Sequence, residues 1–272
     1  MSHTPASLPQ KVLALDTSTD RLSLALGPAG GAPLAVYSGP GGAQASAELL
    51  PRLLGLLAEL GWTLAGLDAI AFGQGPGSFT GLRTACSVVQ GLAVAARPGG
   101  VPVLPIPTLL AVAQAALPQA AQAPTPERPL VAVLDARMDE LYVAEAAVVQ
   151  GALRLTAPAA LCAPDQLSTR VGWPAQDHGP APVLLAGNAL GTYGTRLPAA
   201  WQAVPQIEAW PTAIALLVLA ATAWQQGGDV AAADAQPLYV RDKVAQTTEE
   251  RARLKAAAAP HTAAHSAPHS AP

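Results

Sequence analysis

The chain has 272 residues, of which 51% are hydrophobic and 12% are charged, so it can bury a sizeable core in one large domain or two smaller lobes. Its formal net charge is −3, and its 15 lysines and arginines are scattered along the sequence. This distribution argues against strong unaided binding to a polyanion such as RNA, because neutralising phosphates requires concentrated positive charge.

The first predicted element is a hairpin of two strands joined by an acidic turn. The string VLALDTSTDRLSLA near the N-terminus aligns without gaps with VAVLDARMDELYVA in the middle of the chain, so Asp16 matches Asp135 and Asp20 matches Asp139. In each copy an aliphatic run precedes the turn and an alternating segment follows it, as in strands. This internal repeat predicts two related lobes, each opening with an aspartate-bearing hairpin.

A leucine-rich helix is predicted over residues 46–61, with Gly61 as its stop. Pro51 is placed near its first turn, where the loss of an amide proton is tolerated. The helix has more leucine than one buried face needs: Leu49, Leu50, Leu53, Leu54, Leu57 and Leu60.

A glycine-rich turn, GQGPGSFTGLR, occupies residues 73–83 after a predicted buried strand over 67–72. Ser78 or Thr80 can cap a second helix that runs to Ala96. No lysine follows the glycines as in a P-loop, and the acidic residue of a dinucleotide fingerprint is missing. The pattern therefore favours a tight strand-to-helix connection over a phosphate cradle.

This second helix is apolar almost all round, with Arg83 and Gln90 as its strongly polar residues. Such a helix must be covered on more than one side, either by its own fold or by another chain. The pattern alone leaves both alternatives open.

After Pro107, Thr108 is predicted to cap an alanine-rich helix that precedes the smaller second lobe. The later predicted elements are a proline-broken linker at 121–129, a strand at 183–186, a turn at 187–189, a buried helix at 212–226, an extended segment at 237–240 and a disordered tail at 256–272.

Four strings also carry a family resemblance: VLALDTSTD, GPGSFTGLR, LDARMDELYVA and PLYVRDKVAQTTEE. Together they resemble the bacterial TsaB family from about Lys11 to about Leu254. The resemblance implies an α/β fold with two lobes, of the actin, sugar-kinase and heat-shock ATPase superfamily. We expect the first lobe at 11–107, with the hairpin, glycine turn and interface helices, and a second, reduced lobe at 130–245.

TsaB-like proteins are the non-catalytic partner subunit of the tRNA threonylcarbamoyladenosine machinery. The resemblance implies a scaffold with no catalytic residue of its own, which pairs with a homologous catalytic threonylcarbamoyltransferase subunit. It further implies an associated small ATPase, tRNA reached indirectly through the complex, and first-lobe helices that pair with the catalytic subunit or self-associate. The partner-interface residues that we predict are Leu49, Leu53, Leu57, Ser78, Phe79, Thr80, Leu82, Arg83 and Val89.

In catalytically active members of the superfamily, the first turn combines an aspartate, hydroxyls and a glycine to hold nucleotide phosphates and a metal. Asp16, Thr17 and Ser18 are therefore the candidate cofactor-binding residues, although the glycine is absent. The residue types favour the alternative, an Asx or Ser/Thr turn that closes the hairpin. The resemblance implies no cofactor of the chain's own, and it leaves open ATP or ADP with magnesium at an interface shared with a partner.

Two enzyme classes remain as alternatives. An independent small-molecule kinase or ATPase would use Asp16, Thr17, Ser18 and the glycine turn. A serine hydrolase based on Ser78 would need a histidine base, but the histidines lie in the tails or in an irregular loop. Because no histidine lies between His3 and His178, we also expect no metal site of the paired-histidine type in the first lobe.

Cysteine usage and hydropathy predict the compartment. Cys86, in a predicted helix, and Cys162, in a predicted loop, provide neither a disulfide framework nor metal spacing, which suits a reducing cytoplasm and packing roles. The chain does not open with a secretory pattern, and its most apolar segment, 213–223, is too short to span a bilayer. We therefore expect a cytoplasmic protein without a membrane partner.

Overall fold

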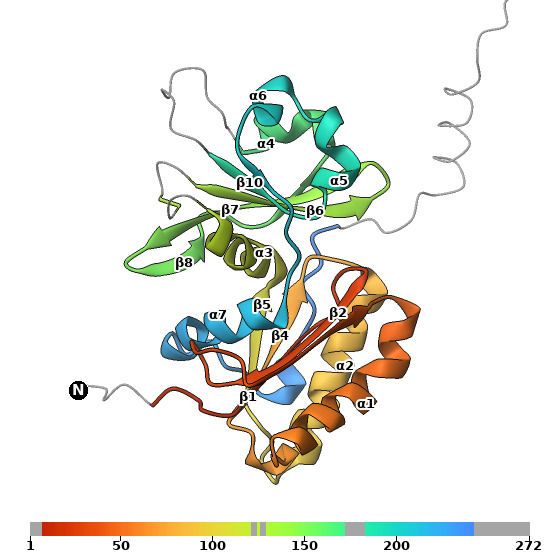
Figure 1. The fold of residues 1–272 in the computed structure, drawn as a ribbon, viewed down its shortest axis with the longest axis vertical. Coiled ribbons are helices and arrows are strands. Elements are labelled where there is room, and N and C mark those ends of the chain that lie inside the picture. Colours follow the sequence, from red (N-terminus) through yellow and green to blue (C-terminus); the bar gives the residue numbers. More distant parts are fainter. Residues whose placement is uncertain (1–6, 121–123, 126–128, 172–182, 242–272) are drawn as a thin grey trace, which may run out of the picture. The chain divides into compact units, whose positions relative to one another are not determined.

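The fold contains two β-sheets with helices on their faces (Figure 1). This computed structural model describes residues 7–120, 124–125, 129–171 and 183–241. Residues 1–240 form one unit, and residues 241–272 form a second unit of which only Arg241 is described. The predicted tail at 256–272, most of the predicted linker at 121–129 and the last residues of the predicted second lobe lie outside the described residues.

The first sheet has the strand order β3-β2-β1-β4-β5. Strands β1 (Val12–Asp16), β2 (Arg21–Gly27) and β3 (Ala35–Pro40) are antiparallel neighbours, whereas β4 (Ala69–Gly75) and β5 (Val103–Pro107) run parallel to β1. Every residue of β1 is buried, because the strand is covered on both faces, as its continuous aliphatic run predicts.

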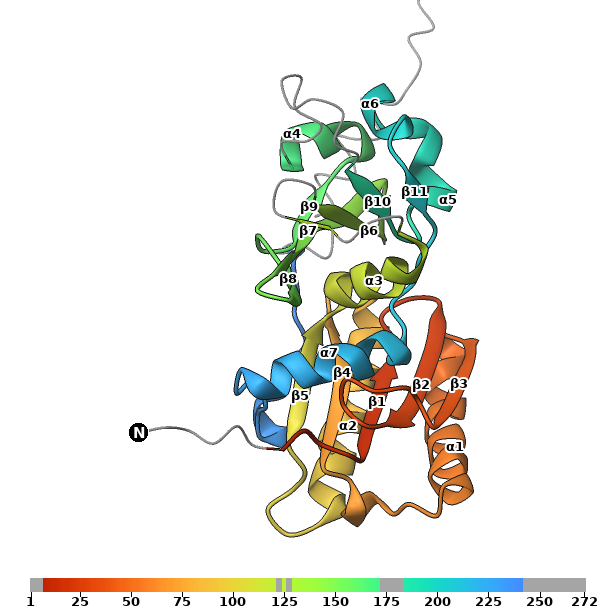
Figure 2. The same cartoon turned by 60° about the vertical axis from the view of Figure 1, so that its left-hand side comes forward.

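Helices cover both faces of this sheet (Figure 2). Helices α1 (Ala43–Glu59) and α2 (Phe79–Ala96) pack on the face that contains Leu13 and Leu15. Helix α7 (Ala213–Gln225) packs on the opposite face, with Val12 and Ala14. Helix α1 begins earlier than predicted, so Pro51 lies in its interior rather than in its first turn.

Among the described residues, α2 is the one helix long and apolar enough to cross a membrane by length and composition, with a mean hydropathy of 1.2. Its buried stripe packs on β4, which is the arrangement of a core helix in a globular domain.

The second sheet repeats the first. Its order is β11-β10-β6-β7-β8, with β9 also paired to β7. Strands β6 (Leu130–Arg137), β7 (Glu140–Val149), β8 (Ala152–Leu155) and β9 (Ala160–Cys162) are antiparallel, and β10 (Leu184–Ala186) and β11 (Gln206–Ile207) run parallel to β6. When the strand order of the second sheet is read from β8 to β11, three antiparallel strands are followed by two parallel strands, as in the first sheet. The internal sequence repeat thus corresponds to a repeat of topology.

The second sheet has shorter helices on its outer face. Helix α4 (Leu167–Val171) precedes the first parallel strand of the second sheet, as the 17-residue α1 does in the first sheet. Helices α5 (Leu190–Tyr193) and α6 (Ala199–Gln202) connect the two parallel strands, as α2 does in the first sheet. They pack around the buried Trp201. The reduced second lobe predicted from the sequence is confirmed in this respect. The short 3₁₀ helices are Leu64–Gly66, Leu117–Gln119, Pro164–Gln166, Gly194–Arg196 and Ala232–Asp234.

Two helices exchange sheets. Helix α3 (Thr108–Ala116) follows the last strand of the first sheet but packs on the second, and α7 follows the last strand of the second sheet but packs on the first. The sequence placed α7 in the second lobe by its position in the chain. Both helices are apolar, and their contact with each other covers the sides that the sheets leave open.

Candidate functional site

The turn after β1 is closed by the chain's own groups. Asp16 Oδ1 accepts hydrogen bonds from the backbone N–H of Ser18 (2.9 Å) and from Ser18 Oγ (2.7 Å). Thr17 Oγ1 donates to the carbonyl of Gly81 at 2.7 Å. Asp16, Thr17 and Ser18 are all buried, with exposed fractions of 1%, 0% and 2%. This arrangement is the Asx turn that the residue types favour.

The glycine-rich turn packs directly on this hairpin turn. A β-carbon at Gly73 would overlap Asp16 Oδ2, and one at Gly81 would overlap the carbonyl oxygen of Thr17. The backbone N–H of Ser78 donates to the carbonyl of Ser18 at 2.7 Å. The glycines therefore permit a close approach between two segments of the same chain.

The second carboxylate oxygen of Asp16 is enclosed. Oδ2 is buried without a hydrogen-bond partner, and burial raises the pKa of Asp16 from 3.8 to about 6, although the two hydrogen bonds from Ser18 lower it. In this structure the chain itself supplies the hydrogen-bond partners of Asp16, Thr17 and Ser18, so nucleotide binding by these three residues stays a prediction.

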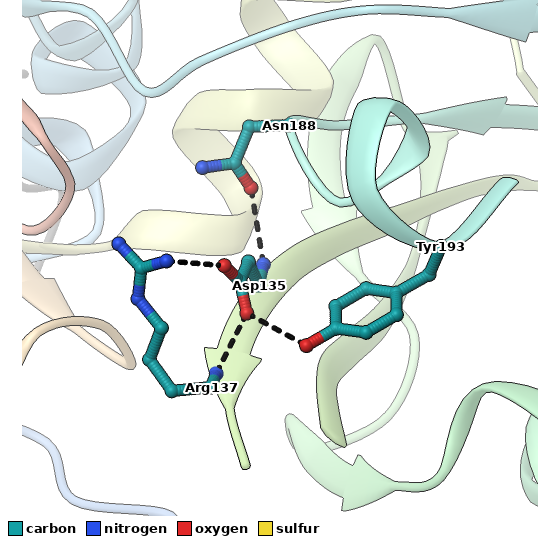
Figure 3. Close-up of polar contacts among 4 residues, drawn as sticks. All are labelled: Asp135, Arg137, Asn188 and Tyr193. Atoms are coloured by element: carbon teal, nitrogen blue, oxygen red, sulfur yellow. Dashed lines mark hydrogen bonds and ion pairs between the residues drawn. The ribbon is translucent and has the colours of Figure 1, made fainter. Parts of the chain in front are cut away.

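The matching aspartate of the second sheet, Asp135, is also satisfied by neighbouring residues (Figure 3). Its Oδ1 accepts hydrogen bonds from the backbone N–H of Arg137 (2.7 Å) and from the hydroxyl of Tyr193 (3.2 Å). Its Oδ2 forms an ion pair with Arg137 Nη1 at 3.0 Å. The carboxylate that corresponds to Asp16 is thus neutralised by a guanidinium of its own chain.

The hairpin after Asp135 has an unusual backbone. Arg137, Met138 and Asp139 have φ values of 61°, 56° and 60°. Positive φ at the two central residues, Met138 and Asp139, is the geometry of a type I′ turn, which Asn and Gly normally occupy. An ion pair between Arg196 Nη1 and Asp139 Oδ1, at 2.6 Å, supports the turn.

The predicted turn at 187–189 lies between β10 and the short α5. Gly187 has a φ of 149°, and a β-carbon there would overlap the carbonyl of Val133. Asn188 Oδ1 accepts a hydrogen bond from the backbone N–H of Asp135 at 3.0 Å (Figure 3). Both residues therefore connect β10 to β6 within the second sheet.

The predicted partner-interface residues divide into two groups. Ser78, Phe79, Thr80 and Arg83 are exposed at the start of α2. The apolar members lie in the core of the first sheet, with exposed fractions of 3% or less: Leu49, Leu53, Leu57, Leu82 and Val89. For this second group the prediction is wrong, because the residues that repeat at helical spacing bury against the chain's own sheet.

The outer faces of α1 and α2 carry exposed apolar residues that are not among the predicted interface residues. Leu50, Leu54 and Val94 have exposed fractions of 43%, 51% and 68%. A β-carbon at Gly55 or Gly91, inside these helices, would meet no atom within 4 Å. Packing within the chain thus requires neither glycine, and their helical positions would be more stable with alanine. The spacing of Leu50 and Leu54, one residue after the buried Leu49 and Leu53, is the signal that marks this outer stripe.

The remaining titratable side chains offer little further chemistry. Among the described residues, no group of three or more His, Cys, Asp or Glu is placed to hold a metal ion. Cys86 in α2 and Cys162, which lies on β9 rather than in a loop, are both buried, which confirms their packing role. Burial raises the pKa of the Cys162 thiol to about 11.

Comparisons with known proteins agree with the topology. The family model for TsaD, tRNA N6-adenosine threonylcarbamoyltransferase, matches residues 42–248. The chain is 33% identical over 249 residues to the tRNA threonylcarbamoyladenosine biosynthesis protein TsaB of Haemophilus influenzae, covering 86% of this chain and 94% of that protein. It is 34% identical over 135 residues to the protein of the same name from Escherichia coli, covering 50% of this chain and 54% of that protein. The solved structure of YeaZ from Pseudomonas aeruginosa, 38% identical, superposes with a TM-score of 0.70 over 85% of this chain and 99% of that one.

Proposed function

Because the chain belongs to the TsaB family of tRNA threonylcarbamoyladenosine biosynthesis proteins, we propose that it acts in that modification as a non-catalytic partner subunit. It pairs with a homologous catalytic subunit and organises that subunit for transfer of a threonylcarbamoyl group to the adenosine next to the tRNA anticodon. The associated small ATPase and the tRNA join through this complex, in the cytoplasm.

The observation that carries the non-catalytic role is the closure of the first turn. All three side chains that would hold a nucleotide are hydrogen-bonded within the chain, and the glycine turn packs directly against them. At the second turn, Arg137 already neutralises Asp135. ATP or ADP with magnesium, if it takes part, would therefore bind where a partner contributes the ligands.

The pairing surface that we propose is the outer face of α1 and α2. It replaces the buried leucines of the interface predicted from the sequence. Leu50, Leu54 and Val94 supply exposed apolar area, whose burial contributes roughly 25 cal/mol per Å² before the costs of association. Gly55 and Gly91 present bare backbone to solvent, which allows a partner's helix to approach closely.

The function is tested by reconstituting the tRNA modification from the purified catalytic homologue, the adenylate-forming enzyme and the small ATPase, with and without this chain. Mass spectrometry of the nucleosides measures the product. We expect product only when the chain is present, and equal product with Ser78→Ala, since Ser78 has no hydrolytic role. Equal product in the absence of the chain would overturn the proposal.

A calorimetric titration of the isolated chain with magnesium ATP tests the alternative of an independent kinase or ATPase. The closed turn predicts no detectable heat. Tight binding that Asp16→Asn weakens would support the kinase or ATPase instead.

A further inference from the structure

Residues 235–240, here called the strap, form an extended segment that lies across the glycine turn and the start of α2. The backbone N–H of Leu238 donates to the carbonyl of Gln74 at 2.8 Å. Further along α2, Gln90 Nε2 donates to the carbonyl of Ala235 at 2.9 Å. The strap is therefore held against β4 at Gln74 and against α2, the longest helix on the first sheet, at Gln90.

The strap brings Tyr239 into a cluster with Phe79 and Arg83 of α2. The rings of Phe79 and Tyr239 lie 5.3 Å apart, and the guanidinium carbon of Arg83 lies 3.9 Å from the centre of the Phe79 ring. Arg83 Nε also donates to the hydroxyl of Tyr239 at 3.1 Å. These contacts fix three long side chains before any partner arrives, which lowers the entropic cost of binding.

The cluster remains open to solvent despite its apolar character. Phe79 and Tyr239 have exposed fractions of 39% and 43%, and the neighbouring Leu238 has 37%. Aromatic residues and arginine are the residues most enriched in the energetically dominant parts of protein interfaces. The composition of this patch therefore matches that of a binding hot spot.

The charge of the cluster indicates what would bind. Arg52, Arg137 and Arg196 each form an ion pair with a carboxylate, whereas Arg83 forms none among the residues that the structure describes. Its Nε is used by Tyr239, so its two Nη groups can meet a carboxylate from outside the chain.

We propose that Phe79, Arg83, Leu238 and Tyr239 form a docking surface for a protein that presents a carboxylate among apolar side chains. The inference rests on the proposed function, under which that protein is the homologous catalytic subunit. A protein fits better than single-stranded RNA, because a chain of net charge −3 with scattered cations lacks the basic groove that RNA binding requires.

Titration calorimetry of the full chain against the catalytic homologue tests this surface. We expect Arg83→Glu and Tyr239→Ala each to weaken binding at least tenfold, with Tyr239→Phe weakening it less because the ring remains. Arg21→Glu is the matched control, since Arg21 is also exposed and stacked on an aromatic ring, 3.6 Å from the centre of Trp210, but lies outside the patch. It should bind as the wild type does, and thermal melts check that every variant folds.

The outcomes separate this inference from the function on which it rests. If Arg83→Glu and Tyr239→Ala bind normally while Leu54→Glu does not, the docking surface is wrong and the proposed pairing stands. If the wild type does not bind the homologue, both fail. If the variants keep the homologue but lose binding to an anticodon stem-loop RNA in fluorescence anisotropy, the patch binds RNA and the inference is overturned.

Discussion

At the scale of single residues, Asp16 has an environment that favours its neutral form. It is buried, and one of its carboxylate oxygens has no partner, so its pKa is raised from 3.8 to about 6. The native state then binds the proton more tightly than the unfolded state does. The stabilising effect is complete below about pH 4 and is lost as the pH rises through about 6.

The pH dependence of stability should therefore differ between the wild type and Asp16→Asn. The amide keeps an acceptor for Ser18 but carries no charge, so its stability relative to the wild type should increase by up to about 3 kcal/mol between pH 4 and pH 7. Urea unfolding across this range measures the difference. A constant difference between the two proteins would mean that the Asp16 pKa is not raised.

Met138 is a second residue at which a substitution should change the free energy of unfolding. It has a φ of 56° and is 56% exposed, so its side chain gains little from burial while its backbone has the left-handed conformation. Asn tolerates this conformation better, and Met138→Asn should raise the free energy of unfolding by roughly 0.5–1 kcal/mol. Chemical denaturation measures the gain, with Met138→Leu as a control that should show none.

At the scale of elements, α1 has two leucine stripes with different roles. Leu53 is fully buried against the sheet, whereas its neighbour Leu54 is 51% exposed. Helical spacing alone identifies both stripes, but it does not indicate which of them faces the sheet. The orientation of the helix is set by β1, β2, β4 and α2, which contribute most of the rest of the core cluster.

Glutamate at these two neighbouring positions should have opposite effects. Leu53→Glu buries an unpaired charge and should destabilise the chain by more than about 3 kcal/mol. Leu54→Glu should leave the melting temperature close to that of the wild type and abolish pairing with the catalytic homologue. Thermal melts and size-exclusion chromatography of the mixture test both; normal pairing by Leu54→Glu would exclude this face of α1.

At the scale of the whole molecule, the exchange of α3 and α7 makes each sheet depend on the other half of the chain. The face of the first sheet that contains Val12, Ala14 and Ala71 is covered by α7, which comes after the second sheet in sequence. Without α7 this face would be an exposed apolar surface of several strands.

A fragment of residues 1–120 should therefore fail to fold alone, although it contains every strand of the first sheet. We expect near-ultraviolet circular dichroism without fixed side-chain signals and a tendency to aggregate. A fragment that unfolds cooperatively like the full chain would show that α7 is dispensable for this sheet.

Local patterns were sufficient for much of this molecule. The paired hairpins, the helices of the first half and the Ser78 cap of α2 follow from periodicity and capping, which depend on residues close in sequence. Family membership likewise follows from contiguous strings. Thr108 shows the limit of such reasoning: its hydroxyl accepts a hydrogen bond from the N–H of Gly75 instead of capping its own helix.

The register of strand pairing in the second hairpin could not be predicted from the sequence either. The gapless repeat matches Ser23 with Tyr142, yet Asp16 pairs with Ser23 while Asp135 pairs with Leu141. A bulge between Asp135 and Arg137 shifts the second hairpin by one residue. Nothing in the aligned strings marks that bulge.

By itself, then, the sequence determined the repeated α/β architecture and the family, because hydrophobic period and motif strings are local properties. Only the tertiary structure decided which leucines are buried, which sheet α7 covers, and what the glycine turn packs against. The last case gives the reason: Gly73 lacks a β-carbon because Asp16 Oδ2 lies against it, and those residues are 57 positions apart in the chain. Contacts over such separations depend on how the strands are ordered, which no local pattern encodes.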